Sequence, residues 1–229
     1  MVVCVAAAVI EGITGKLKAF HKQVVSTRFF GIQTYVCACC LNNGKLTVNG
    51  NWTGECAGIY APNGSVTLAG NAVVTVNLES NNNSNYTAYG ILAETGITIT
   101  YSSSFTATCT ASESTEGANG LCVSGEDADI VINTFGDVTI DTSGNSGTYV
   151  GSHSVYNAGG GDNILKKVGT MTLVWWENSS EEYGVHADAS PAWTLDGPFD
   201  KTETTDATYA AKKTTVYKSA EPVYEISVN

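Results

Sequence analysis

A repeated unit of about thirty residues is the feature that most restricts how this chain can fold. The copies align at residues 38–48, 58–68, 90–100, 120–132, 154–166 and 184–195. Their second residue is apolar in each copy: Cys39, Ile59, Ile91, Leu121, Val155 and Val185, at intervals of 20, 32, 30, 34 and 30. A fixed period of this length is typical of repeat architectures, in which each unit buries its apolar face against the next.

Within each unit, short runs alternate between apolar and polar residues. The first pair is represented by Ile59 and Ala61, Ile91 and Ala93, Leu121 and Val123, and Val185 and Ala187. The second pair is Leu46 and Val48, Val66 and Leu68, Ile97 and Ile99, Ile130 and Ile132, and Trp193 and Leu195. A third run holds Val74, Val76 and Leu78; Phe105 and Ala107; Val138 and Ile140; and Met171 and Leu173. Strict alternation predicts strands with one face toward a core and one toward water.

Three short strands per unit cannot bury their apolar faces alone, but stacked units can. No helical pattern separates the runs, so the coil itself must connect one parallel strand to its copy in the next turn. The sequence therefore predicts an all-β parallel β-helix, a solenoid of about six turns. An antiparallel sandwich would also give short, regular strands, yet it does not require an apolar residue after the glycine in every period.

Composition supports an all-β chain. Thr, Gly, Ser and Asn make up 89 of the 229 residues, and charged residues make up 14%. Helix bundles are excluded, because too few Lys, Glu, Arg and Leu are present to cover helical surfaces. Intrinsic disorder is excluded as well, since 43% of the residues are hydrophobic.

Insertions and chain ends define the predicted organisation. The longest inserts, residues 79–86, 111–119 and 175–183, all precede the start of a new unit, which marks one corner of the coil as variable. We expect three regions, listed from the start of the chain: an N-terminal cap at 1–30, β-helix repeats at 31–196, and C-terminal strands or cap at 197–229. The first includes a short amphipathic helix at residues 16–25, and the last includes two strands, KTTVYKS and PVYEISV.

The net charge of −11 bears on partners and location. A phosphate backbone would be repelled, so nucleic acid is not an expected partner. No apolar run approaches the roughly 20 residues of a membrane span. The first ten residues lack the basic start of a secretory signal, so a signal would have to lie upstream, or export would follow another route.

Seven cysteines follow no disulfide framework, and the group Cys37, Cys39 and Cys40 is the densest. A zinc site would need a second ligand pair, which the sequence does not supply. We expect Cys37 and Cys39 to act as small apolar residues on the inner side of a strand.

The pattern G-[IL]-x-[AV], followed by a turn and by [VI]-T-[LI], resembles the secreted bacterial β-helix repeat proteins. These include carbohydrate-binding β-helix modules related in fold to pectate lyases. The resemblance covers about residues 36–196. It implies a parallel β-helix, an extracellular or cell-surface location, and a polysaccharide or surface glycan as partner.

Carbohydrate-active β-helices include two enzyme classes, and each requires a distinct set of catalytic residues. A pectin-type hydrolase needs paired aspartates with Gly-His-Gly and Arg-x-Lys motifs, and none of these combinations occurs. A lyase needs a cation-binding acidic cluster beside a basic residue. Lys166 and Lys167 fall near units that carry several aspartates, so this class stays open, although the single arginine, Arg28, lies outside the repeats.

The aspartates in question are Asp127, Asp129, Asp137 and Asp141. Their carboxylates are the hard oxygen ligands that Ca²⁺ prefers, and the spacing within each pair places its two members on one side of an extended chain. The sequence therefore predicts a candidate calcium site, with a solvated turn as the alternative.

Aromatic residues are the predicted sugar contacts, because a pyranose ring stacks on a flat apolar face. The candidates near the insert corner are Trp175, Trp176, Tyr183, Tyr86 and Tyr89, together with Trp193. Alternation directs Trp175 and Trp176 to opposite faces, so one of them is expected in the core. These residues favour a non-catalytic surface protein that binds glycans. The alternatives are a self-assembling adhesin or filament subunit that binds copies of itself, and a calcium-dependent polysaccharide lyase.

Overall fold

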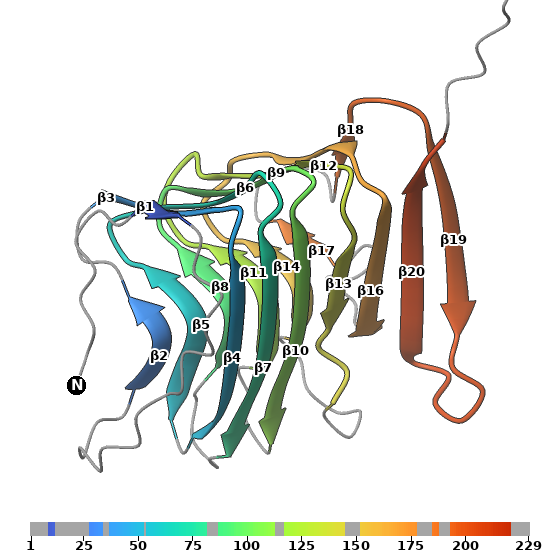
Figure 1. Ribbon diagram of the computed structural model, residues 1–229. Helices are drawn as coiled ribbons and strands as arrows, with labels where there is room; N and C mark the ends of the chain where they lie inside the picture. The colour runs from blue at the N-terminus through green and yellow to red at the C-terminus, as the bar shows by residue number, and fades with distance from the viewer. Residues whose placement is uncertain are drawn as a thin grey trace, which may run out of the picture.

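The structure, a computed structural model, describes residues 9–11, 28–33, 37–52, 54–81, 87–112, 117–144, 152–177, 185–187 and 193–220. In these ranges the chain forms twenty β-strands and no helix, so none of the described segments is a long apolar helix that could cross a membrane. The strands wind into a coil with three sheets around a common core (Figure 1). The predicted all-β parallel β-helix is confirmed.

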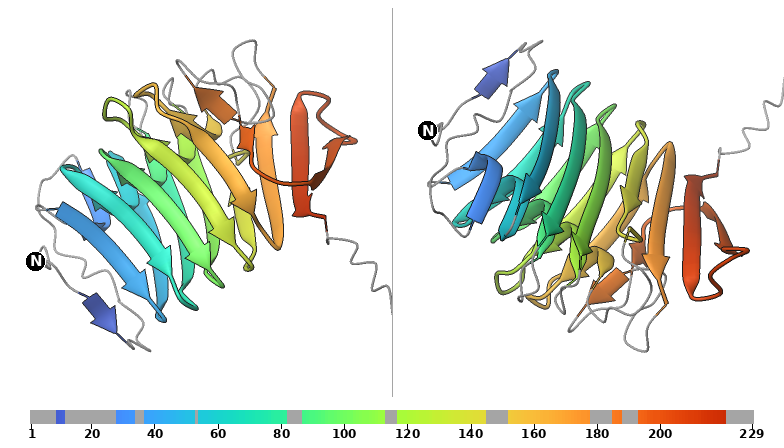
Figure 2. Two further views of the ribbon diagram at one scale, coloured as in Figure 1. Left: turned by 90° about the horizontal axis from the view of Figure 1, so that it is seen from above. Right: turned by 90° about the horizontal axis from the view of Figure 1, so that it is seen from below.

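Each turn of the coil gives one strand to each sheet, and we name the sheets A, B and C. Sheet A contains β2 (Arg28–Gln33), β5 (Glu55–Ala61), β8 (Ala88–Ala93), β11 (Ala118–Val123), β14 (His153–Asn157) and β17 (Val185–Ala187). Sheet B contains β1 (Val9–Glu11), β3 (Cys37–Asn42), β6 (Gly64–Ala69), β9 (Gly96–Tyr101), β12 (Asp129–Thr134), β15 (Asn163–Lys167) and β18 (Thr194–Leu195). Sheet C contains β4 (Lys45–Trp52), β7 (Val73–Asn81), β10 (Ser104–Ser112), β13 (Val138–Asp141) and β16 (Thr170–Trp176), followed by β20 (Lys212–Ser219) and β19 (Phe199–Thr205). Figure 2 shows the turns stacked along one axis.

Four full turns, from β5 to β16, form the middle of the coil. The strands β2, β3 and β4 precede them, and the short strands β17 and β18 follow as an incomplete turn. The predicted count of about six turns is therefore slightly too high. The shortfall lies at the C-terminal end, where an antiparallel hairpin takes the place of a further strand in sheet C.

Stacked apolar columns fill the interior. In sheet A, Ile59, Ile91, Leu121, Val155 and Val185 are partners in successive turns, and all are buried. Sheets B and C contribute the predicted second and third runs of the middle turns, such as Val66 beside Ile97 and Val74 beside Phe105. The predicted stacking of like positions is confirmed for these turns.

The first copy of the repeat begins one strand earlier than the predicted alignment places it. Cys39 pairs with Val66 in sheet B, and Leu46 pairs with Val74 in sheet C. The true counterpart of Ile59 is Ile32, which is its partner in sheet A. The interval of 20 residues between Cys39 and Ile59 is much shorter than the other intervals of the repeat. The interval from Ile32 to Ile59 is 27 residues, which is closer to them. The small apolar cysteine matched the hydropathy pattern of the wrong strand.

The glycine that opens the repeated motif is required by packing. A Cβ atom on Gly58 would lie 2.6 Å from both γ-carbons of Val76 on sheet C and 2.7 Å from the carbonyl oxygen of Gly90. Gly90 and Gly120 occupy the same place in the next turns and would meet Ala107 and Ile140 in the same way. Sheet A thus approaches sheet C too closely at this column for a side chain.

The inserts fall at one corner, as predicted. Strand β7 ends at Asn81 and β8 begins at Ala88, while β10 ends at Ser112 and β11 begins at Ala118. The same holds between β16 and β17. Each insert therefore connects a strand of sheet C to the next strand of sheet A.

A hairpin completes sheet C at its C-terminal end (Figure 1). Strand β20 pairs antiparallel with β16, and β19 pairs with β20. Tyr217 of β20 is buried, and Phe199 of β19 packs against the core. The predicted strand KTTVYKS corresponds to β20, whereas β19 was not predicted. The predicted helix at residues 16–25 and the strand PVYEISV lie outside the described residues.

Candidate functional site

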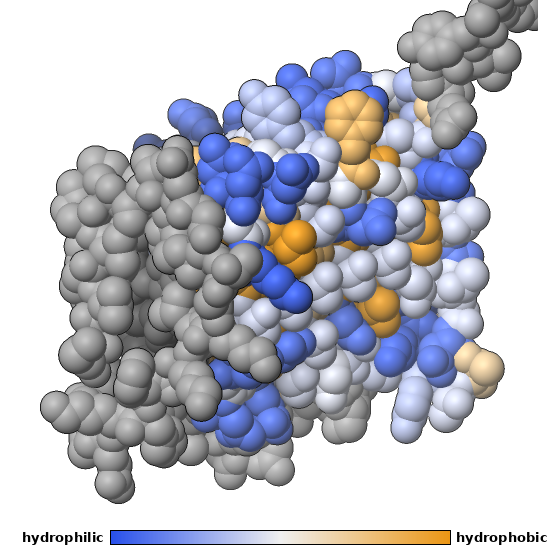
Figure 3. Space-filling view, viewed as in Figure 1, coloured by the Kyte–Doolittle hydropathy of each residue, from blue (hydrophilic) through white to orange (hydrophobic). Residues whose placement is uncertain are grey.

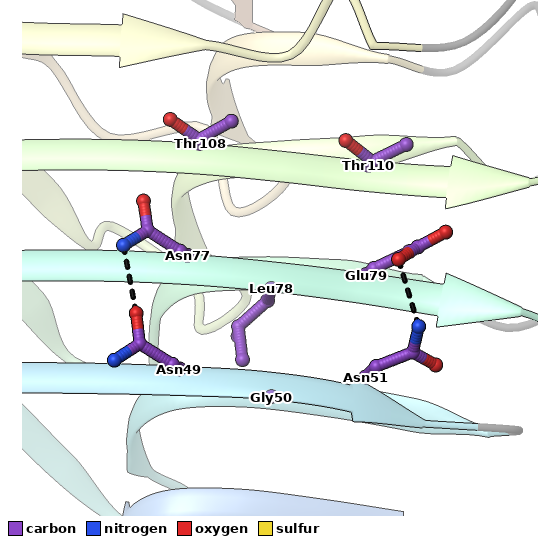
Figure 4. Close-up of a pocket in the computed structure, with 8 residues that line it drawn as sticks. All are labelled: Asn49, Gly50, Asn51, Asn77, Leu78, Glu79, Thr108 and Thr110. Atoms are coloured by element: carbon purple, nitrogen blue, oxygen red, sulfur yellow. Dashed lines mark hydrogen bonds between the residues drawn. The ribbon is translucent and has the colours of Figure 1, made fainter.

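A shallow groove crosses the outer face of sheet C, over the second halves of β4, β7 and β10 (Figure 4). Its volume is about 710 Å³, which is within the range of small-ligand sites. Alternation along the strands turns a set of polar side chains toward it: Asn49, Asn51, Asn77, Glu79, Thr108 and Thr110.

Paired polar groups form the rim of the groove. The Asn77 side-chain amide donates a hydrogen bond of 2.8 Å to Asn49 Oδ1, and Asn51 Nδ2 donates one of 2.8 Å to Glu79 Oε2 (Figure 4). The residues of each pair are opposite each other in adjacent strands. An asparagine amide offers two donor hydrogens and a carbonyl acceptor, so a single bond leaves Asn49 and Asn77 further capacity toward a ligand.

The floor of the groove is apolar. Gly50 is the partner of Leu78 in the adjacent strand, and it carries no side chain. Leu78 belongs to the core, but it also lines the groove between the two polar pairs (Figure 4). Leu78 is only 3% exposed, so the hollow joins a floor made of the Gly50 backbone and a small apolar surface to a rim of amides, hydroxyls and one carboxylate.

The groove is lined by amides, hydroxyls and a single carboxylate. Glu79 is the one ionisable side chain among the residues that line the groove. Glycoside hydrolysis normally requires two carboxyl groups, one to donate a proton and one to activate water or attack the sugar. The groove thus offers hydrogen bonds and an apolar contact without a pair of reacting groups.

The two tryptophans predicted as sugar contacts are packed inside the molecule. Trp175 is 3% exposed, and its indole N–H donates a 3.0 Å hydrogen bond to Thr215 Oγ1. Trp176 is on the opposite side of the strand, 8% exposed, and donates a 3.2 Å bond to the carbonyl oxygen of Ser143. Tyr209 covers it edge-on at 5.7 Å between ring centroids. The opposite orientation of the two indoles is as predicted, and both have packing roles.

The remaining aromatic candidates within the described residues, Tyr89 and Trp193, do not line the groove. Tyr89 is half-buried on sheet A, and Trp193 is partly buried against the core. Tyr86 and Tyr183 lie outside the described residues. None of the predicted aromatic residues that the structure describes lines the groove.

The four aspartates of the predicted calcium site are also separated. Asp127 and Asp129 lie at the start of β12 in sheet B, while Asp137 and Asp141 flank or belong to β13 in sheet C. The strand between the two pairs spans about 17 Å. Asp129 Oδ1 accepts a 2.8 Å bond from the Asp162 backbone N–H, and Asp141 Oδ1 accepts bonds from Ser143.

In the described residues, no three His, Cys, Asp or Glu side chains are close enough together to hold a metal ion. The lysines of the lyase alternative have other contacts: Lys166 Nζ lies 3.8 Å from Asp196, and Lys167 Nζ lies 3.6 Å from the centre of the Phe135 ring. Among the described residues, Asp129 and Asp141 therefore accept hydrogen bonds at turns, and the four carboxylates do not converge.

Five described cysteines are free thiols: Cys39, Cys40, Cys56, Cys109 and Cys122. Cys39 faces the core, as expected. Burial, with a smaller effect from Cys40, raises the pKa of Cys39 to about 11, and burial together with Glu55 raises the pKa of Cys56 to about 12. Burial also raises the pKa of Cys109 and Cys122. Neutral, buried thiols are inert as nucleophiles.

The groove was missed by the sequence analysis, although a signal was present. The segments TVNGN (47–51) and TVNLE (75–79) are copies of one another, and their polar residues stack in register. Only the apolar positions were aligned, whereas the outward positions repeat as well.

No family model, no curated protein and no solved structure matches the chain.

Proposed function

We propose that this protein is a non-catalytic β-solenoid of the extracellular space or cell surface that binds polysaccharide through the groove on sheet C. In this proposal it resembles the secreted bacterial carbohydrate-binding β-helix modules of pectate-lyase-like fold. The observation that carries the proposal is the combination of the Leu78 floor with the Asn49, Asn77 and Glu79 rim.

A sugar ring has an apolar face of C–H groups and an edge of hydroxyls, so it is complementary to such a surface. Side-chain amides can both donate to and accept from hydroxyls, and the Glu79 carboxylate can accept from them. Because the strands hold the amides in register, little conformational entropy is lost when a ligand binds.

Charge favours a neutral polysaccharide. Glu79 is the one charged group at the groove, and the whole chain carries a net charge of −11. A polymer of uronic acids would be repelled by this field, more strongly at low ionic strength. Neutral polysaccharides carry no charge and are not repelled by this field.

Isothermal titration calorimetry with soluble neutral and acidic polysaccharides tests the proposal. The double variant Asn49→Ala, Asn77→Ala should weaken binding of a neutral polysaccharide at least tenfold. The matched control is Asn63→Ala, which removes an exposed amide from the turn between β5 and β6, away from the groove, and should leave affinity unchanged. Equal affinity of the double variant and the unchanged chain would contradict the proposal.

A further inference from the structure

Three exposed apolar side chains lie near the corner where sheet B passes into sheet C, in a molecule whose surface in Figure 3 is mostly polar or neutral with isolated apolar side chains. Val73 is 40% exposed, and Tyr101 and Phe135 are each 66% exposed. They belong to three successive turns: Val73 begins β7, Tyr101 ends β9, and Phe135 follows β12. We name these three residues the corner ridge. The other large exposed hydrophobic residues of the described chain, Leu195 and Tyr209, lie near its C-terminal end.

Tyr101 has a backbone conformation that its side chain does not favour. Its φ is +60°, and the positions that match it in the two preceding turns are Gly70, with φ +64°, and Asn43, with φ +56°. Glycine and asparagine adopt this left-handed conformation readily, whereas tyrosine does so at a cost. Because the Tyr101 ring is largely exposed, its burial does not offset the free-energy cost of this backbone conformation. Strain of this kind at an exposed residue points to a role in binding.

The two aromatic residues are held firmly at the corner. The Phe135 backbone N–H donates to the Tyr101 carbonyl oxygen. Thr134 Oγ1 donates to the Ser103 carbonyl oxygen at 2.7 Å, lies 3.1 Å from the Tyr101 carbonyl oxygen, and accepts from the Gly136 N–H. The Lys167 ammonium rests 3.6 Å from the Phe135 ring centre. The rings are therefore presented by a fixed backbone.

The surroundings of the corner ridge suit sugars. Exposed Asn71, Ser102 and Asn133 lie on the same turns as the ridge and provide amides and a hydroxyl next to the rings. Tyr101 and Phe135 lie on adjacent turns, which are about 4.8 Å apart, while Val73 is in register with Ser104, three residues after Tyr101. The two aromatic residues therefore follow one another along the solenoid axis, and an extended chain of pyranose rings that runs along this axis can contact both.

We propose that the corner ridge is a second binding subsite, where a neutral polysaccharide lies along the solenoid axis and stacks its sugar rings on Tyr101 and Phe135. This inference rests on the proposed function and names its ligand class. Neutral polysaccharides are favoured because the charges beside the ridge, exposed Lys45 opposite Val73 and exposed Asp137, offset each other, while Lys167 is already engaged with Phe135. The net charge of −11 of the whole chain disfavours acidic polymers.

The decisive variant is Tyr101→Gly, because it removes the ring and relieves the backbone strain together. Binding of hydroxyethyl cellulose, a soluble neutral β-glucan, should weaken at least tenfold, while the melting temperature stays the same or rises. Tyr101→Phe keeps the ring and should bind within about twofold of the unchanged chain. Leu195→Ala, at an exposed apolar residue away from the ridge, is the matched control and should bind normally.

The outcomes separate this inference from the proposed function. If the groove variant loses binding while Tyr101→Gly retains it, the ridge is not a subsite but the groove proposal stands. If the unchanged chain binds polygalacturonate in preference to the neutral glucan, polysaccharide binding stands and the neutral ligand class is wrong. If the unchanged chain binds neither polymer nor any other polysaccharide, both proposals fail.

Discussion

A methyl group added at Gly58 would press against Val76 on the opposite sheet, at 2.6 Å from both of its γ-carbons. We expect Gly58→Ala to destabilise the fold by about 1 to 3 kcal/mol, because a packed core yields only by shifting its backbone. Gly44→Ala is the control: its Cβ would meet no atom within 4 Å, and its φ is not left-handed. Chemical denaturation measures both variants. Equal stability of the two would show that sheet A does not approach sheet C this closely.

The buried thiols give the stability a dependence on pH. Burial raises the pKa of Cys39 to about 11 and of Cys56 to about 12, from an ordinary value of 9.0. Above pH 9 the unfolded chain loses thiol protons that the folded chain retains, so the free energy of unfolding falls as pH rises from 9 toward 11 or 12. Below pH 9 these groups contribute no pH dependence.

Urea denaturation between pH 8 and pH 11 measures this effect. The decline should be smaller in Cys56→Ala than in the unchanged chain, since one of the titrating thiols is gone. Identical slopes for the two proteins would show that Cys56 is not held as a neutral buried thiol. The comparison of slopes also removes the contribution of tyrosines and lysines, which both proteins share.

Between strands, the solenoid depends on columns of like residues. Ile91 and Leu121 are partners in β8 and β11, and both are fully buried. Ile91→Asp would bury an unpaired charge and should destabilise by about 3 to 5 kcal/mol. Thr98→Asp, on the outward side of β9, should cost little. Thermal melts of the two variants test this column. Small and equal effects on the melting temperature would contradict the placement of Ile91 in a buried column.

Apolar alternation made the strands of the middle turns predictable, because an inward residue every second position has few other interpretations. It failed in the first unit, where the small cysteines matched the pattern of a different strand. It also missed β19, whose side chains are almost all exposed and so carry no apolar period. Burial of Trp176 depends on Tyr209, which is 33 residues away in the sequence, so local spacing does not predict this contact.

The candidate site was harder to predict than the fold. Its rim residues face outward, where hydropathy imposes no pattern, and its floor depends on one missing side chain at Gly50. Tyr101 could not be singled out either, because its importance comes from a backbone angle that the sequence does not state. Packing constrains the inner positions of a repeat, while the outer positions are free to carry function.

At the scale of the whole molecule, the hairpin determines how sheet C ends. Its outermost strand, β19, presents exposed Asp200, Lys201 and Glu203 among its residues. Charged side chains on an edge strand discourage pairing with another chain. The side of the solenoid, with its groove and corner ridge, is therefore a better-supported interaction surface than this edge.

Affinity electrophoresis through gels that contain soluble polysaccharides tests the central claim most directly, provided that the polymers recovered from each gel are analysed for cleavage. The account predicts that at least one neutral polysaccharide slows the native protein, that a calcium chelator does not change this, and that the polymer remains intact. Unchanged mobility in every gel would contradict binding. Calcium-dependent shortening of the polymer would contradict the non-catalytic assignment and favour the lyase alternative.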